Sequence, residues 1–333
     1  MAYTTIDDPS AYVQTKLYTG TQQSHAVTLD GNSDLQPDWV WIKCRDDTHN
    51  HQVFDSVRGV HIRMRTDTNG AETTSSESLK SFDSDGFTLG TQQNVNASAS
   101  NDNSFVAWNW KETATAGFDI VSYTGNGSNR TISHSLSAVP KVMFVKRRSS
   151  ASDWTCYFEA LGNTKRGILN SSAAPDTAST FWNSTTPTSS VFSVGTSGGT
   201  NASSETYIAY LFAEKKGFSK FGEFIGNGNA NGTFVYTGFK PAWILVKNTE
   251  ITEGAWVIND NKRNAFNPNS NTLTPHNSET ENTGTDRTDF LSNGFKLRVG
   301  SSTAWNGNGN TIIYMAFAEN PFVTSTGIPT TAR

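Results

Sequence analysis

Few residues of this chain stand in patterns that could carry out chemistry, and the histidines of "HNHQ" are the first of them. His49 and His51 alternate, so a strand at this point would direct both imidazoles to one face. Imidazole nitrogens are common metal ligands, and His61 is the nearest further candidate. No cysteine or carboxylate pattern completes a ligand set around them, so the sequence favours loop histidines, with no metal site and no cofactor.

Acidic pairs are the second candidate for chemistry. Asp46 with Asp47, and Asp7 with Asp8, could bind calcium or serve as the acid pair of a glycosidase. Both pairs stand in turn-like sequence, which favours solvated carboxylates. The chain has no Gly-x-Ser-x-Gly motif, and "SVRG" and "GTSGGT" lack the strand–glycine–helix setting of a phosphate loop. We therefore expect a protein that is not an enzyme.

The elements that must position any site are strands. Short runs such as "DWVWIK", "KVMFVK" and "TYIAYLF" are β-branched and aromatic and are bounded by turn residues, whereas helical periodicity is almost absent. Their continuous apolar character indicates strands that are covered on both faces. The sequence predicts an all-β protein.

One set of landmarks occurs three times along the chain. Each copy opens with a glycine that stands two residues after an aromatic residue. A proline follows, then an apolar strand that ends in a lysine, and later a second apolar strand that leads to a glutamate. The landmarks are Gly20, Pro37, Lys43 and Glu112; Gly125, Pro140, Lys146 and Glu214; and Gly226, Pro241, Lys247 and Glu319. Such order in so many landmarks indicates an internal repeat.

A repeat of about 100 residues has the size of one β-sandwich domain and is too long for a propeller blade or a solenoid rung. We expect three tandem antiparallel β-sandwich repeats, at residues 1–115, 116–217 and 218–333. The joints "ATAGF" and "EKKGF" are short enough to bring the repeats into contact. A single globule that shares strands between copies is the alternative.

Each copy also retains a lysine and a glutamate at the ends of its two apolar strands. The pairs are Lys43 with Glu112, Lys146 with Glu214, and Lys247 with Glu319. Antiparallel neighbouring strands would hold the two charges apart, whereas parallel or facing strands would bring them together. Because all three copies retain both residues, we expect an ion pair in at least two of them; solubilising charges at strand ends are the alternative.

The tryptophans divide into two groups. Seven of the nine fall in or beside the repeated apolar strands and are expected in the core: Trp39, Trp41, Trp108, Trp110, Trp154, Trp243 and Trp256. Trp182 in "TFWNSTT" and Trp305 in "TAWNGNGN" stand among polar residues. An exposed indole there would suit a protein–protein contact or a stacked sugar, and a protein–protein contact is favoured.

Composition narrows the class further. The chain has 333 residues, a net charge of -4 and 17% charged residues, which favours neither nucleic acid nor an anionic membrane as a partner. No apolar run is long enough to span a membrane, and "MAYTTIDDPS" lacks the features of a secretory signal. Cys44 and Cys156 stand at different places in the repeat, so we expect two small buried side chains and no disulfide.

At this point a resemblance appears. "MAYTTIDDPSAYVQTKLYTG", "YTGNGSNRTISHSLSAVPKVMFVKRRSS…W" and "DSDGF…W" resemble a module of bacteriophage virion structural proteins, particularly of marine and cyanobacterial phages. Such relatives are labelled tail-fibre, appendage or virion proteins, and the resemblance covers nearly the whole chain. It implies no catalytic residues. It implies a virion protein, assembled in the host cytoplasm, with other virion proteins as partners and with a tendency to form homo-oligomers.

Three hypotheses of function remain. The favoured one is a structural or adhesion protein of the virion, in a tail fibre or tail appendage, with capsid decoration as its nearest alternative. A carbohydrate-binding module for host-surface glycans is the second hypothesis, and a glycan-degrading enzyme is the third. The enzyme hypothesis needs a pair of carboxylates in a groove, and comparison of the three copies singles out no such acid.

Overall fold

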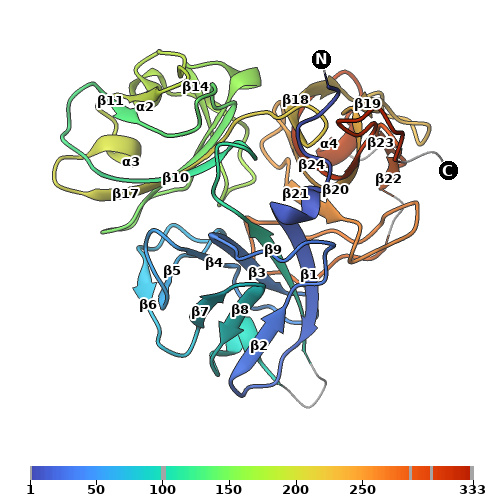
Figure 1. The fold of residues 1–333 in the computed structure, drawn as a ribbon. Helices are drawn as coiled ribbons and strands as arrows, with labels where there is room; N and C mark the ends of the chain where they lie inside the picture. The colour runs from blue at the N-terminus through green and yellow to red at the C-terminus, as the bar shows by residue number, and fades with distance from the viewer. Residues whose placement is uncertain (1, 99–102, 285–286, 301–302, 331–333) are drawn as a thin grey trace.

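The computed structural model describes residues 2–98, 103–284, 287–300 and 303–330. The protein is all-β, and its strands form antiparallel sheets. We refer to residues 1–115, 116–217 and 218–333 as the first, second and third segments. Each sheet of the described residues takes its strands from one segment. Figure 1 shows the sheets of the three segments as separate groups around a common centre.

The first segment contains a larger and a smaller sheet. The larger sheet has the order β1-β9-β3-β4, and the smaller one the order β2-β8-β7, beside a two-stranded sheet of β5 and β6. The bounds are β1 Val13–Thr19, β2 His25–Thr28, β3 Trp39–Cys44, β4 Gln52–Asp55, β5 Ile62–Arg63, β6 Thr73–Thr74, β7 Leu79–Asp83, β8 Gly86–Leu89 and β9 Ser104–Trp110. The short helices are η1 (Pro9–Ala11) and α1 (Gln93–Asn96).

The second segment has a larger sheet of order β10-β17-β12-β13-β14-β15 and a smaller one of β11 and β16. Its strands are β10 Phe118–Thr124, β11 Arg130–Ser133, β12 Val142–Arg147, β13 Thr155–Phe158, β14 Lys165–Ile168, β15 Asp176–Thr177, β16 Val191–Val194 and β17 Thr206–Phe212. Its helices are η2 (Glu159–Leu161), α2 (Ser179–Trp182) and α3 (Gly198–Asn201).

The third segment has sheets of order β18-β24-β20-β21 and β19-β23-β22. Its strands are β18 Ser219–Ile225, β19 Phe234–Tyr236, β20 Phe239–Asn248, β21 Trp256–Asp260, β22 Thr288–Leu291, β23 Gly294–Leu297 and β24 Thr311–Pro321, and α4 is Thr303–Asn306. The strands of "DWVWIK", "KVMFVK" and "AWILVK" (β3, β12 and β20) thus hold the same place, between the long closing strand and its outer neighbour. We call residues at the same register position of different segments counterparts.

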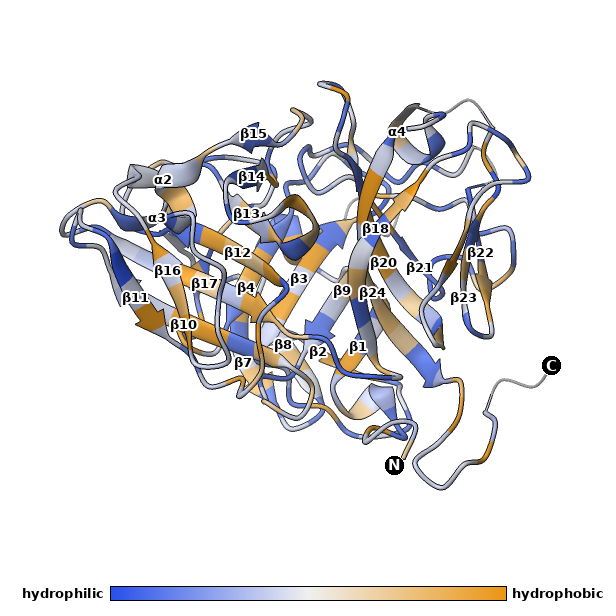
Figure 2. Ribbon diagram, turned by 90° about the horizontal axis from the view of Figure 1, so that it is seen from above, coloured by the Kyte–Doolittle hydropathy of each residue, from blue (hydrophilic) through white to orange (hydrophobic). Residues whose placement is uncertain are grey.

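The apolar central strands are covered on both faces, as their sequence predicts. In β3, the side chains of Val40 and Ile42 belong to a cluster with the smaller sheet of the first segment, while Trp39 and Trp41 belong to a different cluster. This alternation follows from the two-residue period of a strand. Figure 2 shows hydrophobic stretches in larger-sheet strands such as β12 and β17.

The second face of each larger sheet packs against the other segments. One central cluster contains buried side chains from all three segments, including seven tryptophans that were expected in the core: Trp39, Trp41, Trp108, Trp110, Trp154, Trp243 and Trp256. Trp110 lies edge-on to Trp243 at 5.5 Å between ring centroids, and Trp39 stacks on Tyr210 at 5.0 Å. The segments therefore share one core in addition to their separate ones.

A buried asparagine fastens the first hairpin of each segment to the short helix before the closing strand. Asn201 accepts a hydrogen bond from the amide of Asn126 at 3.0 Å and donates to the carbonyls of Ser128 and Gly195, both at 2.7 Å. Asn96 and Asn306 are its counterparts and make equivalent bonds. These three asparagines were not predicted from the sequence, although each is the last residue of the short helix before a closing strand.

The same contact explains the glycine that opens each copy. A Cβ on Gly20 would lie 1.9 Å from the carbonyl oxygen of Ala97, and one on Gly125 would lie 2.2 Å from that of Ala202. Only glycine allows the hairpin backbone to approach the helix this closely.

Replacing Asn201 by alanine is expected to lower the free energy of unfolding by about 2–3 kcal/mol, because the change leaves buried backbone groups without partners. Urea denaturation followed by tryptophan fluorescence measures the loss. Ser203→Ala is the matched control, because Ser203 is exposed and lies only two residues further along the chain, and we expect it to change stability by less than about 0.5 kcal/mol. Equal stability of the two variants would contradict the fastening role.

The two ends of the chain meet on the third segment. The hydroxyl of Tyr3 donates to the carbonyl of Gly238 at 2.6 Å, and Asp7 accepts from the amide of Ser325 at 2.6 Å. In the described part of the chain, every helix is too short to cross a membrane.

Candidate functional site: the interfaces between the segments

Trp182 and Trp305, which the sequence analysis placed on the surface as ligand or interface candidates, are buried. Trp182 is 1% exposed and Trp305 is 2% exposed. The indole of Trp182 donates to the carbonyl of Lys165 at 3.0 Å and lies edge-on to Tyr157. Both residues stand in short helices, α2 and α4, which turn the ring inward while their polar neighbours remain in the turns. The prediction of exposed indoles is wrong.

The three retained lysines are also buried. The ammonium of Lys146 donates to the carbonyls of Asn69 at 3.0 Å and Ser152 at 2.5 Å. Lys247 donates to Ser172 and Gly254, and Lys43 to Cys44 and Asp47. Burial lowers the pKa of each lysine to about 8. Because Asn69 lies in the first segment and Ser172 in the second, two of these lysines join neighbouring segments.

The expected Lys–Glu ion pairs do not form, because the two strands of each pair are antiparallel neighbours. In the first segment, Trp39 lies opposite Trp110 and Lys43 lies opposite Val106, so Lys43 and Glu112 stand at opposite ends of the sheet. At about 3.3 Å per residue this separation is roughly 20 Å. The same register separates Lys146 from Glu214 and Lys247 from Glu319. The prediction of contact is wrong in all three copies.

The glutamates have a different role, at the joint to the next segment. A carboxylate oxygen of Glu112 accepts from the amide of Ile120 at 3.0 Å, and one of Glu214 accepts from the amide of Phe221 at 2.8 Å. Each bond ties the end of a closing strand to the first strand of the following segment. Glu214 pairs in addition with Lys141 at 3.2 Å, and Glu319 pairs with Lys240 at 2.7 Å.

Glu112 differs from its counterparts because it has acidic neighbours. Burial, together with the nearby carboxylates of Asp119 and Asp38, raises its pKa to about 7. The folded state therefore holds a proton that the unfolded state releases near the ordinary value of 4.5. The stability that this proton confers is complete below pH 4.5 and is lost as the pH rises through 7.

Glu112→Gln is accordingly expected to stabilise the protein at pH 8 by about 1 kcal/mol, allowing for solvent screening of a half-exposed group, and to have little effect at pH 4.5. Urea denaturation at the two pH values checks this. The matched control is Glu214→Gln, which loses the ion pair to Lys141 and should gain no stability at pH 8. A gain for both variants, or for neither, would contradict the assignment.

His51 was expected in a loop but lies in the core as the counterpart of two tryptophans. His51 directly precedes Gln52, which pairs with Ile42 of β3. In the same way, Trp154 directly precedes Thr155, which pairs with Val145 of β12, and Trp256 directly precedes Val257, which pairs with Val246 of β20. His51 is 0% exposed. Its Nδ1 accepts from the indole of Trp41 at 2.9 Å, so the proton of the neutral ring is on Nε2. Burial holds the pKa of His51 well below its usual range.

These three rings form a closed cycle of hydrogen bonds between segments. Trp154 of the second segment donates to the carbonyl of Arg65 in the first at 2.7 Å, and Trp256 of the third donates to Ile168 in the second at 2.8 Å. His51 of the first segment closes the cycle with a bond of 3.2 Å to Thr274 in the third. The three acceptors, Arg65, Ile168 and Thr274, are themselves counterparts. Each directly follows a residue that pairs with the second residue after the ring: Met64 pairs with Val53, Gly167 with Cys156, and Leu273 with Ile258.

Buried ions reinforce two of the three interfaces. Between the first and second segments, Arg58 donates to Asp55 at 2.5 Å, Asp55 also accepts from the hydroxyl of Tyr210 at 2.6 Å, and Arg148 binds Glu72 through two hydrogen bonds. The side chains of Asp55 and Arg58 are both 0% exposed.

The interface between the third and first segments repeats this network with counterpart residues. Arg263 donates to Asp260 at 2.5 Å, and Asp260 accepts from the indole of Trp108 at 2.9 Å. Glu281 accepts a hydrogen bond from Arg45 at 2.8 Å. The shared sequence signal is "DSVR" and "DNKR", four residues beyond His51 and Trp256. The roles of Arg58 and Arg263 were not predicted, because "SVRG" was weighed only as a phosphate loop.

The interface between the second and third segments has no such network in the described residues. The network residues of the first interface are Asp55, Arg58, Glu72, Arg148 and Tyr210. Their counterparts here are, in the same order, Phe158, Leu161, Pro175, Thr249 and Met315. Phe158 and Met315 belong to the central cluster, and Leu161 packs against it. One interface is thus apolar where the other two are ionic.

A family model described as "Domain of unknown function (DUF7483)" matches residues 8–321. The chain belongs to this family. No curated protein and no solved structure matches the chain. The matched range begins one residue before η1 and ends at the last residue of β24, so the family unit comprises all three segments together.

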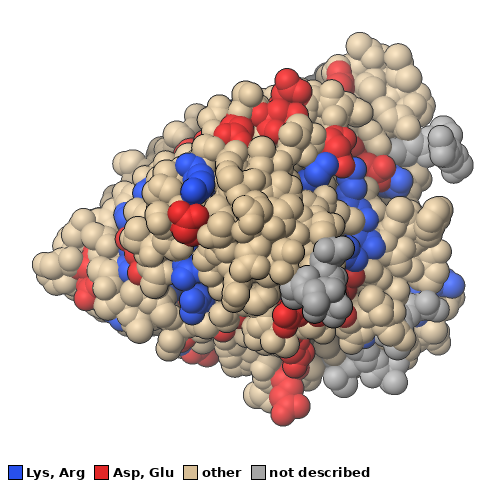
Figure 3. All heavy atoms as spheres, turned by 90° about the horizontal axis from the view of Figure 1, so that it is seen from below, with Lys and Arg blue, Asp and Glu red and all other residues tan. Residues whose placement is uncertain are grey.

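Other candidate chemistry is sparse. The described residues contain no group of three or more His, Cys, Asp and Glu side chains that could hold a metal ion. Cys44 and Cys156 are both free and buried, which confirms the prediction of two small core side chains. Figure 3 shows acidic and basic residues interspersed over the face that it presents, without a field of one sign.

Proposed function

We propose that each segment is one β-sandwich repeat and that the three repeats pack as a single rigid block. The support is that the sheets of the described residues each lie within one segment, that a separate apolar cluster lies between the larger and smaller sheets of each, and that a fourth cluster joins all three. The boundaries expected from sequence, 1–115, 116–217 and 218–333, fall in the joints between strands β9 and β10 and between β17 and β18.

We infer that this block is a non-enzymatic structural protein of a bacteriophage virion, most consistent with a tail fibre or tail appendage that acts in assembly or host attachment. The observation that supports the structural, non-enzymatic part of this inference is the cycle of hydrogen bonds from His51, Trp154 and Trp256 around one shared core. The ring nitrogens, ion pairs and buried lysines that could otherwise serve chemistry are used to hold the segments together.

The phage assignment rests on the sequence resemblance alone, because the family model carries no function. The same resemblance leads us to propose that the partners are other virion proteins, that the protein assembles in the host cytoplasm, and that it forms homo-oligomers. A fixed three-part block suits such a role, because it can occupy a defined position without a flexible linker.

The test is to locate the protein in purified particles. Mass spectrometry of density-purified virions should detect the chain, and immunogold labelling or a particle map should place it on the tail. Density on the capsid surface instead would replace the tail assignment by capsid decoration. Absence from purified particles that contain the other structural proteins would overturn the proposal.

A further inference from the structure

One surface of the third segment carries large side chains that the fold does not require. The smaller-sheet strands β2, β11 and β19 are counterparts, and each buries one central residue: Val27, Ile132 and Val235. The outward positions beside that residue are Ala26 and Thr28 in the first segment and Thr131 and Ser133 in the second. In the third segment they are Phe234, 44% exposed, and Tyr236, 50% exposed.

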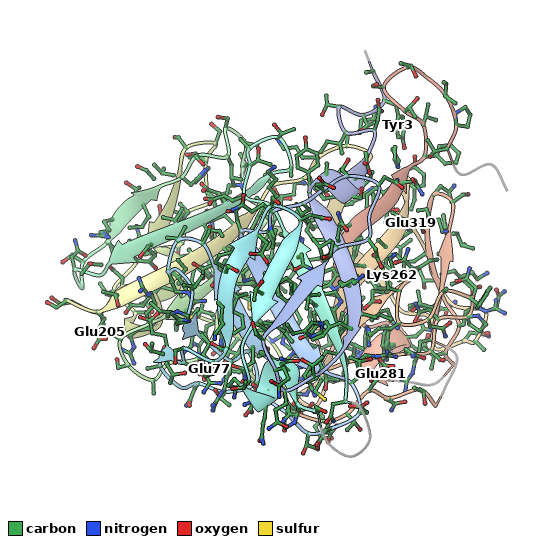
Figure 4. The ribbon with its side chains drawn as sticks, turned by 60° about the horizontal axis from the view of Figure 1, so that its bottom comes forward. Tyr3, Glu77, Glu205, Lys262, Glu281 and Glu319 are labelled. Atoms are coloured by element: carbon green, nitrogen blue, oxygen red, sulfur yellow. The ribbon has the colours of Figure 1, made fainter. Side chains whose placement is uncertain are left out.

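A groove of about 380 Å³ lies beside Tyr236. Its lining includes Tyr3, Lys216, Lys220 and Tyr236, together with Ser219 and Gly238. One acidic residue, Glu214, also lines the groove, and its carboxylate is paired with Lys141 at 3.2 Å. Tyr3 reaches the groove from the N-terminal end of the chain and is fixed there by its hydrogen bond to Gly238. Figure 4 shows Tyr3 at the rim of the molecule, beside the loops of the third segment.

Cations and aromatic rings are interleaved in this groove. The ammonium of Lys216 lies 4.7 Å from the ring centroid of Tyr3, and that of Lys220 lies 5.3 Å from the ring centroid of Tyr236. Among the described residues, no acidic side chain forms an ion pair with either lysine. Lys220 is again a departure from the repeat, because its counterparts are Gln14 and Asp119.

We propose that this groove binds an acidic saccharide, a short stretch of glycan that bears carboxylate or sulfate groups. The tyrosine rings offer flat apolar faces and hydroxyls for a sugar ring, and the two ammonium groups pair with its anionic substituents. The volume is that of a small-ligand site rather than of a flat protein interface. A nucleic acid is disfavoured, because its backbone charge calls for a broad basic surface and the chain has a net charge of -4.

This site goes beyond the structural role proposed above and does not depend on it, because every residue that lines the groove is in this one chain and no virion partner is needed to form it. The test uses the purified full-length protein and isothermal titration calorimetry with three hexasaccharides: alginate for carboxylates, κ-carrageenan for sulfates and maltohexaose as the neutral sugar. We expect a Kd of about 1 mM or tighter for at least one acidic probe and at least tenfold weaker binding of maltohexaose. The acidic probe that binds identifies the anionic group.

Variants then connect the binding to the groove. Tyr236→Ala and Lys220→Gln should each weaken the binding of the acidic probe about tenfold, while Phe266→Ala and Lys80→Gln, which remove an exposed aromatic and an exposed lysine outside the groove, should leave it unchanged. The proposal is overturned if neither acidic sugar binds, if maltohexaose binds equally well, if a twelve-residue oligothymidylate binds more tightly, or if the groove variants bind like the wild type. Particle location does not enter this test, so the two proposals fail separately.

Discussion

Trp305→Ala is expected to lower the free energy of unfolding by about 3–5 kcal/mol, the loss typical of a buried aromatic side chain. Trp305 is 2% exposed and belongs to the cluster of the third segment that contains Phe295, Leu297 and Tyr314. Removal of the indole leaves a cavity between the larger sheet and α4. Denaturation in urea, followed by circular dichroism, measures the change.

The matched control is Phe266→Ala, since Phe266 is 82% exposed and its truncation removes an aromatic ring without a cavity. We expect this control to stay within about 0.5 kcal/mol of the wild type. Trp182→Ala should resemble Trp305→Ala, because Trp182 is likewise buried in the separate apolar cluster of its own segment. A stable Trp305→Ala protein would restore the interpretation of Trp305 as a surface residue.

These two tryptophans show where prediction from sequence ends. The polar neighbours of Trp182 and Trp305 correctly indicate turns, but the direction of a ring within a one-turn helix is set by the sheet beneath it. No local pattern records that sheet. The seven tryptophans in apolar strands were predicted correctly, because a strand of continuous apolar residues has no exposed face on which to place them.

The retained lysines and glutamates show a second limit. Their retention in three copies correctly indicated a structural role, yet the pairing depended on whether the two strands run parallel or antiparallel. With the antiparallel register, Lys146 donates to Asn69 of the preceding segment and Glu214 accepts from Phe221 of the following one. Both residues therefore act between segments, a relation that comparison of the copies with one another could not show.

The same limit applies to the core. The sequence of β3 predicted two covered faces, and both are covered, but it could not say that the second cover is supplied by the other two segments. That arrangement places His51, a polar side chain in a turn-like sequence, at a position where the counterparts are tryptophans. The His51 ring makes the hydrogen bond that the indole N–H makes in Trp154 and Trp256, although imidazole is smaller than indole. The ring of Trp41 packs beside it.

Arg58→Leu is expected to lower the free energy of unfolding by about 3–5 kcal/mol at pH 7, because it leaves the carboxylate of Asp55 buried without its cation. Arg58 donates to Asp55 at 2.5 Å, to the carbonyl of Val53 at 3.1 Å and to the hydroxyl of Tyr210 at 3.4 Å. Burial is the largest single effect and opposes the charge, but Asp55, Tyr210 and Glu72 together outweigh it and raise the pKa of Arg58 above its ordinary value. Chemical denaturation gives the loss, and Arg298→Leu, which breaks a pair whose arginine is 42% exposed, should cost less than about 1 kcal/mol.

The protein itself supplies the rescue of this variant. Asp55, Arg58 and Tyr210 correspond to Phe158, Leu161 and Met315 at the apolar interface, where the same backbone packs without ions. The triple change Asp55→Phe, Arg58→Leu and Tyr210→Met should therefore recover most of the lost stability, because no unpaired charge remains and apolar side chains of similar volume often replace a buried ion pair without cost. If the triple variant is no more stable than Arg58→Leu alone, the two interfaces differ in backbone geometry, and the ions are required at the first. If it is as stable as the wild type, the ion pairs serve mainly to prevent one segment from docking in the place of another, since an apolar interface cannot accept an unpaired Asp or Arg.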